Sequence, residues 1–558
     1  MSRLSASRRK FLKWAGLTGA AALAAACGAT AAPTTAPTTV AGAATAAPAT
    51  AAATATATTA VVGAATASPT TVAATATATT AAATEAAATP TLSAEAQATA
   101  NAVESARATE SAIPLEGLPQ DPALSMTEDQ LLAKMDEDKK KAASEGKTVI
   151  EWLSAWGTIL SDKTQPHYWL MRDYMQQNPN VFIAYTPASA YTGAFNEVIM
   201  MRIASGDPPD VIYHYSSPVA YAARGACLQL DPLMDAHPKL KASALVPNGL
   251  AQVQWKGKTW SIPCTMSPSL VFYSEAKLKE LGVPTDQDKL PQTWDDLRAL
   301  SGKMTKWNGD TLAYAGFLPL AGGFTLYGQI ASMGGSLWDG EKYTINSAEN
   351  VDFLKYILSW LDAEYKGSID KVNASGSWGG LYPGNAMPMG IQGIILDGFW
   401  NFAHCPPEFQ YVYAKTPTAQ KGQTPWNSSW PNMMFIPAKA KHPKEAFDFT
   451  AYCTIDGAKW WWNQWADVPS WKDFPADQPS KEHVARVGEE KALAIAKFAR
   501  VLVNEVVMQW NSPVDDIATD ELGRMLDQVL HKVTDPKTAA DNAQKAIQAK
   551  LDEVSTSG

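Results

Sequence analysis

A long stretch built almost wholly of alanine, threonine, proline, valine and glycine limits how much of this chain can fold. It runs from residue 28 to about residue 110, and no charged residue occurs between Cys27 and Glu85. Such small side chains bury too little apolar area to offset the entropy lost when the backbone is ordered. We therefore expect a disordered tether over residues 28–115. A folded part over residues 116–558 is long enough for two domains.

The segment before the tether is organised like an export signal. Residues 7–13 resemble a twin-arginine motif, and an apolar run from Trp14 to Ala26 follows them. That run is too short to span a bilayer stably. It ends in three alanines before Cys27, an arrangement similar to a lipobox, in which the cysteine becomes the acylated N-terminus. We expect a signal peptide over residues 1–27 and an extracytoplasmic protein anchored to the cell membrane through Cys27. Ordinary signal-peptidase cleavage nearby is the alternative.

Charge and cysteine content narrow the classes of function. The net charge is −9 and no basic stripe is visible, which argues against nucleic acid as a partner. Besides Cys27 there are four cysteines, whose spacing does not suit a zinc knuckle. Two disulfides of unassigned pairing and buried free thiols are both open for these four, which are Cys227, Cys264, Cys405 and Cys453. We expect no metal and no cofactor.

Strands and helices alternate at the start of the folded part. After an amphipathic helix expected at 127–144, strands are predicted at 148–153, 181–185 and 210–213, with helices at 168–177 and 195–203 between them. This order predicts a parallel sheet flanked by helices. A hairpin at 253–262, a strand at 270–273 and a helix capped by Thr293 follow. Later helices are expected at 350–366, 443–453, 492–509, 515–533 and 538–554.

Six short motifs then occur in a fixed order. They are Ala204–Val211, Leu228–Leu233, Lys256–Pro263 with Val271–Ser274, Pro291–Leu297, Ile395–Trp400 and Pro443–Phe449. Together they resemble the family 1 extracellular solute-binding proteins, the group that includes maltose-binding protein, over about residues 146–555. Ser274 departs from the family pattern, in which many relatives have Asn, and the sequence around Met387–Gly390 fits the pattern less well.

The resemblance implies an α/β fold of the class II periplasmic-binding-protein type. Two lobes, each a mainly parallel sheet flanked by helices, would be hinged by crossover strands. The N-lobe would hold about residues 146–265 and 425–460, and the C-lobe about 268–420 and 465–556. Ligand would bind between the lobes, which close around it. The permease of an ABC transporter would recognise the closed form. We expect a monomer.

The candidate ligand-binding residues follow strands, because ligands of open parallel sheets lie beyond the carboxyl ends of the strands. In the first lobe and the hinge these are Trp156, Tyr191, His214, Tyr215, Ser216, Met266 and Ser267. In the family pattern Trp400 faces the cleft from the other lobe, with Asp397 close by. Further tryptophans are candidates for stacking, although core packing is the alternative for each: Trp338, Trp378, Trp430 and Trp510.

These positions are mainly aromatic, hydroxyl-bearing or amide-bearing, and few carry Lys or Arg. A sugar has an apolar face beside a rim of hydroxyls, which suits aromatic stacking and a few directed hydrogen bonds. An anionic ligand would favour arginine forks. The pattern therefore favours a neutral sugar or oligosaccharide. A peptide, a polyamine or glycerol phosphate is the alternative among binding proteins.

A secreted glycoside hydrolase or lyase is the main alternative of another class. Glycoside cleavage needs paired carboxylates, and no recognisable acid/base motif occurs. The sequence also has no G-x-S-x-G elbow, no H-E-x-x-H and no Walker loop. Glycosidase carboxylates can come from distant parts of a chain, so this alternative stays open. We expect a binding protein that is not an enzyme and has no catalytic residues.

Overall fold

The computed structural model describes residues 121, 126–155, 166–187, 195–215, 218–319, 326–506 and 512–557. They all belong to one compact unit of the chain. The predicted signal peptide, Cys27 and the predicted tether lie outside the described residues. So do four of the candidate ligand-binding residues, which are Trp156, Tyr191, Ser216 and Trp510.

The first sheet has five strands in the order β2-β1-β3-β13-β6. They are β1 (Thr148–Ser154), β2 (Val181–Pro187), β3 (Val211–His214), β6 (Ile262–Pro263) and β13 (Met433–Phe435). Strand β1 is parallel to β2 and β3, whereas β13 is antiparallel to β3 and β6. Helices α5 (Pro166–Gln177) and α6 (Phe195–Ala204) connect the three parallel strands, which confirms the predicted βαβαβ order.

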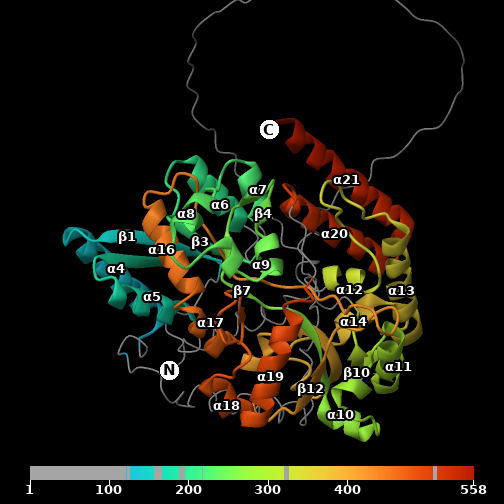
Figure 1. The fold of residues 1–558 in the computed structure, drawn as a ribbon. Coiled ribbons are helices and arrows are strands. Elements are labelled where there is room, and N and C mark those ends of the chain that lie inside the picture. The colour runs from blue at the N-terminus through green and yellow to red at the C-terminus, as the bar shows by residue number, and fades with distance from the viewer. Residues whose placement is uncertain are drawn as a thin grey trace, which may run out of the picture. The chain divides into compact units, whose positions relative to one another are not determined.

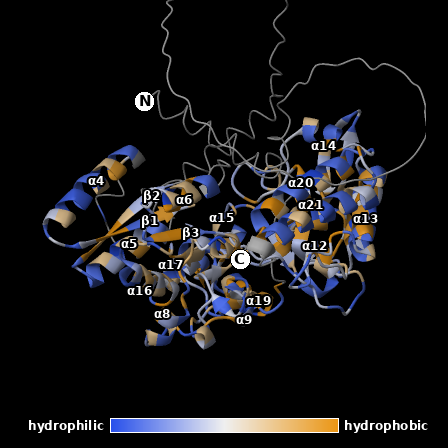
Figure 2. Cartoon of the chain, turned by 90° about the horizontal axis from the view of Figure 1, so that it is seen from above, coloured by the Kyte–Doolittle hydropathy of each residue, from blue (hydrophilic) through white to orange (hydrophobic). Residues whose placement is uncertain are grey.

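Apolar side chains bind this sheet to its helices. Trp152 on β1 and Trp169 on α5 are fully buried. Figure 2 shows β1 and β3 in the colours of hydrophobic residues. The covering helices are α4 (Glu128–Ser144), α7 (Val219–Ala223), α8 (Asp231–Ala236), α16 (Pro443–Thr454) and α17 (Ala458–Trp465).

A hairpin of β4 (Gln254–Trp255) and β5 (Lys258–Thr259) turns through Lys256 and Gly257, whose φ angles are 51° and 70°. Positive φ at both turn residues is typical of tight hairpins.

The second sheet also has five strands, in the order β12-β8-β11-β10-β9. They are β8 (Ser269–Ser274), β9 (Lys306–Asn308), β10 (Thr311–Phe317), β11 (Gln392–Gly398) and β12 (Tyr411–Ala414). Only β10 and β11 are parallel among its paired strands. This sheet is therefore mixed, which differs from the mainly parallel sheet expected for each lobe. The reason is that β8 arrives directly from the other lobe and pairs antiparallel with β11 and β12, while β9 and β10 follow each other through a tight turn. Neither arrangement has the helical crossover that parallel strands need.

A helical layer completes the second lobe. Figure 1 places α20 (Asp515–Leu530) and α21 (Pro536–Ser557) beside α13 (Ala348–Glu364), and the three share an apolar cluster. The other helices of the chain's second half are α10 (Glu275–Glu280), α11 (Trp294–Met304), α12 (Leu326–Ser332), α14 (Ile369–Ser375), α15 (Asn401–His404), α18 (Lys481–Val487) and α19 (Glu489–Leu502). In the first half, α9 (Pro247–Ala251) precedes the β4–β5 hairpin.

Helix α19 ends earlier than the sequence pattern predicts. The expected helix continues to residue 509, whereas α19 ends at Leu502. The Asn504 side-chain amide donates to the Arg500 carbonyl at 2.9 Å. The Glu505 carbonyl accepts from the Asn427 backbone N–H at 2.9 Å. The expected extension is wrong over residues 503–506, because tertiary pairing with a distant segment replaces the last helical hydrogen bonds. Residues 507–509 lie outside the described residues.

The chain passes between the two sheets three times. The first crossover leaves β6 and contains β7 (Thr265–Met266), the second leads from β12 to β13, and the third follows α17 and contains β14 (Val468–Pro469). Strands β7 and β14 pair with each other over two residues each, so the first and third crossovers are joined directly. Three such connections allow one lobe to rotate against the other about a narrow region.

Two further properties of the described residues concern membrane-spanning helices and cysteines. No helix within the described ranges is both long and apolar enough to cross a membrane. The four cysteines of the folded part are buried free thiols, which is one of the two states left open by the sequence. Burial raises the pKa of the Cys264 thiol to about 12, so this thiol is protonated at neutral pH.

Candidate ligand site

Three aromatic rings from different parts of the fold form one group. Tyr215 follows β3, Trp400 follows β11, and Trp430 lies in the second crossover. The Trp430 ring is edge-to-face with Tyr215, with ring centroids 5.7 Å apart, and edge-to-face with Trp400 at 6.0 Å. We call these three residues the aromatic group. It brings together side chains from the first lobe, the hinge and the second lobe.

Trp400 takes its position because of a glycine in the preceding turn. Strand β11 ends at Gly398, and the Trp400 indole lies against that residue so closely that a Cβ there would overlap its six-membered ring. Only glycine allows this approach without a shift of the ring. The Phe399 N–H donates to the Pro268 carbonyl at 3.0 Å, which ties the same turn to the first crossover.

Asp397 is a half-buried carboxyl beside this turn. It precedes Gly398, whose backbone N–H donates to Asp397 Oδ1 at 2.7 Å. Burial raises the pKa of Asp397 to about 6, although the Gly398 hydrogen bond opposes the shift. Near neutral pH the carboxyl is therefore mostly ionised, and it can accept hydrogen bonds from hydroxyl groups.

Three other candidates, His214, Met266 and Ser267, make contacts within the protein. His214 is 4% exposed, and its Nε2 lies 3.1 Å from Asn196 Oδ1. Burial lowers the pKa of His214 to about 4, so the ring is neutral at neutral pH. The Ser267 hydroxyl donates to Asp467 Oδ1 at 2.5 Å. Met266 is fully buried in the core of the second lobe. Direct ligand contact by these residues stays a prediction.

Two candidate tryptophans lie apart from the aromatic group. Trp338 packs on Tyr343, with ring centroids 4.8 Å apart, beside the helical layer of the second lobe. The Trp378 Nε1–H donates to the Val372 carbonyl at 2.8 Å. The next residue, Gly379, bonds to the Gln392 side chain where β11 begins, whereas Asp397 lies at the other end of that strand. The fold thus separates both tryptophans from Trp400.

A buried polar cluster behind the aromatic group was not predicted from the sequence. The Asn432 side-chain amide donates to Thr265 Oγ1 at 2.6 Å and to Asp467 Oδ2 at 2.5 Å. The Ser267 hydroxyl completes the set. We call Thr265, Ser267, Asn432 and Asp467 the hinge cluster. Nothing in the sequence marks Asn432 or Asp467, because each is a single polar residue in an irregular segment.

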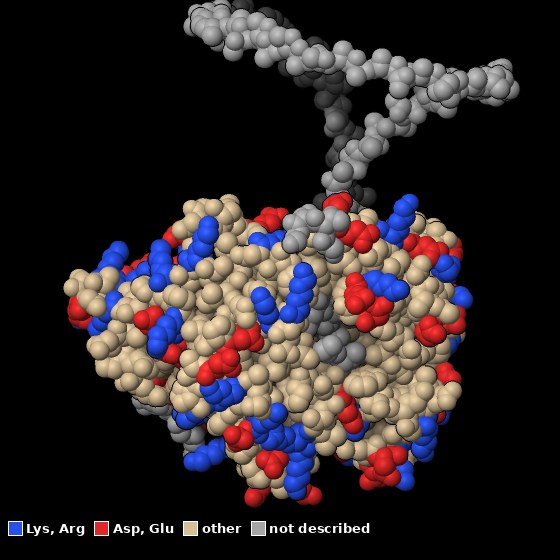
Figure 3. All heavy atoms as spheres, turned by 45° about the horizontal axis from the view of Figure 1, so that its top comes forward, with Lys and Arg blue, Asp and Glu red and all other residues tan. Residues whose placement is uncertain are grey.

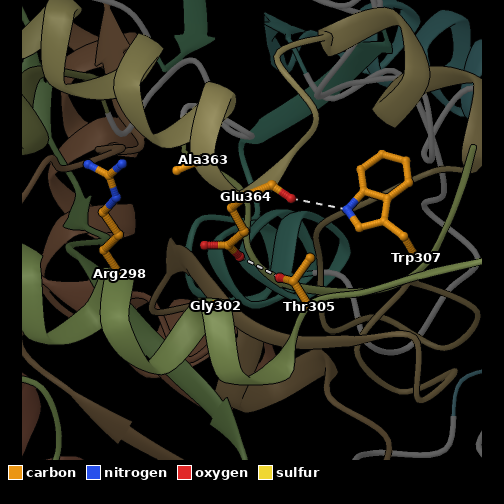
Figure 4. Close-up of a pocket in the computed structure, with 6 residues that line it drawn as sticks. All are labelled: Arg298, Gly302, Thr305, Trp307, Ala363 and Glu364. Carbon is orange, nitrogen blue, oxygen red and sulfur yellow. Dashed lines mark hydrogen bonds between the residues drawn. The ribbon is translucent and has the colours of Figure 1, made fainter.

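Two other surface features, the charged side chains of one face and a hollow, include no residue of the aromatic group. On the face drawn in Figure 3, acidic and basic side chains are interspersed rather than gathered by sign. Figure 4 shows a surface hollow between α11 and the end of α13, lined by Arg298, Gly302, Thr305, Trp307, Ala363 and Glu364. Its Glu364 carboxylate accepts from the Ser301 hydroxyl at 2.5 Å. Among the residues that the structure describes, no set of His, Cys, Asp and Glu could hold a metal ion.

Comparison with known proteins identifies the family. The sequence profile of the family described as bacterial extracellular solute-binding protein matches residues 159–460, which is more than half of the chain. The chain belongs to this family. The resemblance drawn from the six motifs is thereby confirmed. This solute-binding protein is 24% identical over 335 residues to the multiple sugar-binding protein of Streptococcus mutans, covering 58% of this chain and 75% of that protein.

Solved structures confirm the two-lobed α/β fold. An ABC substrate-binding protein from Listeria monocytogenes, in complex with cycloalternan, gives a TM-score of 0.58 at 17% identity, covering 73% of this chain and 99% of that one. Maltose-bound MalE3 of T. maritima gives 0.56 at 15% identity, covering 72% and 99%. At these identities the likeness concerns the fold alone.

Proposed function

We propose that this solute-binding protein captures a neutral sugar or oligosaccharide between its lobes and delivers it to the permease of an ABC importer. The aromatic group carries the proposal. Tyr215 and Trp400 come from opposite lobes and meet at Trp430 in a crossover. Flat rings from both lobes can stack on the apolar faces of a sugar, and the Asp397 carboxylate can accept from its hydroxyls.

The ligands named for similar proteins support this choice. The curated relative is a multiple sugar-binding protein, and the two solved structures hold cycloalternan and maltose. Ligand binding stabilises the closed form of the protein over the open form, and the importer recognises the closed form. This needs no chemical step, so we propose capture without cleavage of any bond. The sequence-based lobe limits, the monomeric state and the absence of a cofactor belong to the same proposal.

A fluorescence titration tests the ligand class. Trp400 and Trp430 would report a sugar that stacks near them, so tryptophan emission should change saturably with maltotriose, mannotriose or a monosaccharide. Spermidine, a tripeptide and glycerol 3-phosphate are the comparison solutes. Saturable binding of one of these in place of every sugar would contradict the proposal. Chromatography of the bound sugar after long incubation should recover it unchanged, and a shortened product would indicate an enzyme.

We also propose that the protein is a lipoprotein of the cell membrane. Cys27 follows three alanines and an apolar run, the order in which an acylated cysteine becomes the N-terminus. Cys27→Ser removes the only group there that can take the thioether-linked lipid. The variant should therefore move from the membrane fraction to the soluble extracytoplasmic fraction, as measured by fractionation and immunoblotting. Ala29→Ser is the matched control. Retention of Cys27→Ser in the membrane fraction would contradict the anchor.

A further inference from the structure

One carboxyl group connects the segments that join the two lobes. Asp467 stands at the start of the third crossover, directly before β14. It accepts from Ser267 in the first crossover at 2.5 Å and from Asn432 in the second crossover at 2.5 Å. Asn432 also donates to Thr265 at 2.6 Å. All three passages of the chain between the lobes are therefore hydrogen-bonded through a single side chain.

The same carboxyl is buried without a compensating charge. Asp467 is 3% exposed, and both of its side-chain partners are neutral. A buried carboxylate with neutral partners only is held at a cost in free energy. Within the described part of the chain, no lysine, arginine or histidine forms an ion pair with it.

Among the described residues, titratable groups approach the hinge cluster from several elements. From β3, the Tyr213 hydroxyl donates to Asn432 Oδ1, and from α5 the His167 ring lies 5.0 Å from the Tyr213 ring. From the first crossover, the thiol of Cys264 accepts from Thr454 at 3.4 Å. From the second lobe, Asp397 is the residue before the last in β11, next to the Gly398–Ser269 pair. Helix α17 contributes apolar rings such as Trp461.

Two backbone hydrogen bonds join this cluster to the aromatic group. The Trp430 N–H donates to the Ser267 carbonyl at 3.0 Å. The Phe399 N–H, directly before Trp400, donates to the Pro268 carbonyl at 3.0 Å. Any rearrangement of residues 267–268 therefore reaches both tryptophans of the aromatic group.

We propose that Asp467 is a positioning residue that clamps the three crossovers behind the ligand site, and that its ionisation loosens this clamp and weakens sugar binding as the pH rises. The proposal rests on the sugar-binding function proposed above. Protonated Asp467 can donate to Ser267 and accept from Asn432, which satisfies the cluster without a charge. The free-energy cost of burying ionised Asp467 falls when water solvates the carboxylate, and water can reach it only when the crossovers separate.

The direction of the pH effect follows from the carboxyl's surroundings. Burial raises the pKa of Asp467 to about 7, far above the ordinary range of an aspartate, although the hydrogen bonds from Ser267 and Asn432 oppose the shift. The clamp is thus complete below about pH 7 and is lost as the pH rises through that value. Linkage limits the effect of one proton to about tenfold in affinity per pH unit.

The test compares the wild-type protein with Asp467→Asn between pH 5.5 and pH 8.5. Asparagine imitates the protonated acid at every pH, because it is uncharged, its NH2 group donates and its carbonyl oxygen accepts. We expect maltotriose or mannotriose, whichever the wild-type protein binds, to bind about tenfold more weakly at pH 8.5 than at pH 5.5. Asp467→Asn should change less than twofold. Asp473→Asn, an exposed aspartate of the same segment, is the matched control and should behave like the wild type.

A ligand-free measurement separates this proposal from the proposed function. Small-angle scattering without sugar should show the wild-type protein opening at pH 8.5 relative to pH 5.5, and Asp467→Asn unchanged. Absence of sugar binding at every pH would refute the proposed function, and with it the binding part of this proposal, while scattering would still decide the clamp. Equal pH profiles of the wild type and Asp467→Asn would overturn the clamp.

A second variant keeps the test decisive if Asp467→Asn fails to fold. Ser267→Ala removes one donor that favours the ionised carboxyl, so it should move the midpoint of the scattering transition to higher pH. An unmoved midpoint would also overturn the assignment to Asp467. A purely structural role of Asp467 would lower stability without moving this midpoint.

Discussion

Trp400→Ala is expected to weaken sugar binding by about 1–3 kcal/mol, or about five- to 150-fold, because it removes the stacking surface that the second lobe contributes. Its indole lies against Gly398 and edge-to-face with Trp430, 6.0 Å away between ring centroids. The ring is only partly buried, so its loss should leave the core of the second lobe intact. Isothermal titration with maltotriose and mannotriose measures the change, and thermal unfolding monitors the fold.

Trp338→Ala provides the control for Trp400→Ala. Trp338 is another partly buried tryptophan of the second lobe, but it packs on Tyr343 and not on the aromatic group. We expect its replacement to change stability and to leave sugar affinity within about twofold. Equal affinity of Trp400→Ala and the wild-type protein would show that the ligand does not lie on the aromatic group. The sugar-binding proposal would then lose the observation that carries it.

His167→Phe is expected to make the protein more resistant to acid, by about 3 kcal/mol at pH 4 relative to pH 8. His167 is 1% exposed and is packed among aromatic rings, including Tyr213 at 5.0 Å and Trp465 at 5.2 Å between centroids. Neither of its ring nitrogens has a hydrogen-bond partner in the described structure. Phenylalanine fills a similar space without those two unsatisfied polar atoms.

The sign of this effect follows from burial. Burial lowers the pKa of His167 to about 3, below its ordinary value of 6.5, so the folded protein holds the ring neutral. Unfolded His167 binds a proton below about pH 6.5. Its contribution to stability is therefore full above pH 6.5 and is lost as the pH falls toward 3. Urea unfolding at several pH values between 4 and 8 measures the difference between variant and wild type.

A surface histidine gives the opposite sign and serves as the control. His531 lies 3.2 Å from Asp370 and 3.1 Å from Asp527. Burial tends to lower the pKa of His531, but these carboxylates and a hydrogen bond to the Asp527 carbonyl raise it overall. Its stabilising contribution is present below pH 6.5 and lost above it, so His531→Phe should not increase acid resistance. An identical pH profile of His167→Phe and wild type would show that His167 is not the acid-sensitive group.

Local features of the sequence determined much of the fold class. The capping box of Thr293 and Asp296 involves residues three apart, and α11 begins where it predicts. The alternation of strands and helices from β1 to β3 follows from equally local patterns, and so does the turn with positive φ at Gly257. Such features need no knowledge of distant partners, because propensity, periodicity and turn chemistry act over a few residues. The order of six motifs then sufficed to place the chain in its family.

Tertiary structure alone decided which side chains meet. The sequence placed Trp400 at the cleft and offered Trp338 and Trp430 alike as further candidates. Only the fold joins Trp430 to Trp400 and Tyr215, while it leaves Trp338 elsewhere. The bond from Ser267 to Asp467 connects residues 200 positions apart, and no periodicity encodes that pairing. Periodicity identifies the buried face of an element but not the partner that covers it. The partner depends on how the two sheets and the three crossovers pack in the tertiary structure. The same packing ends α19 at Leu502.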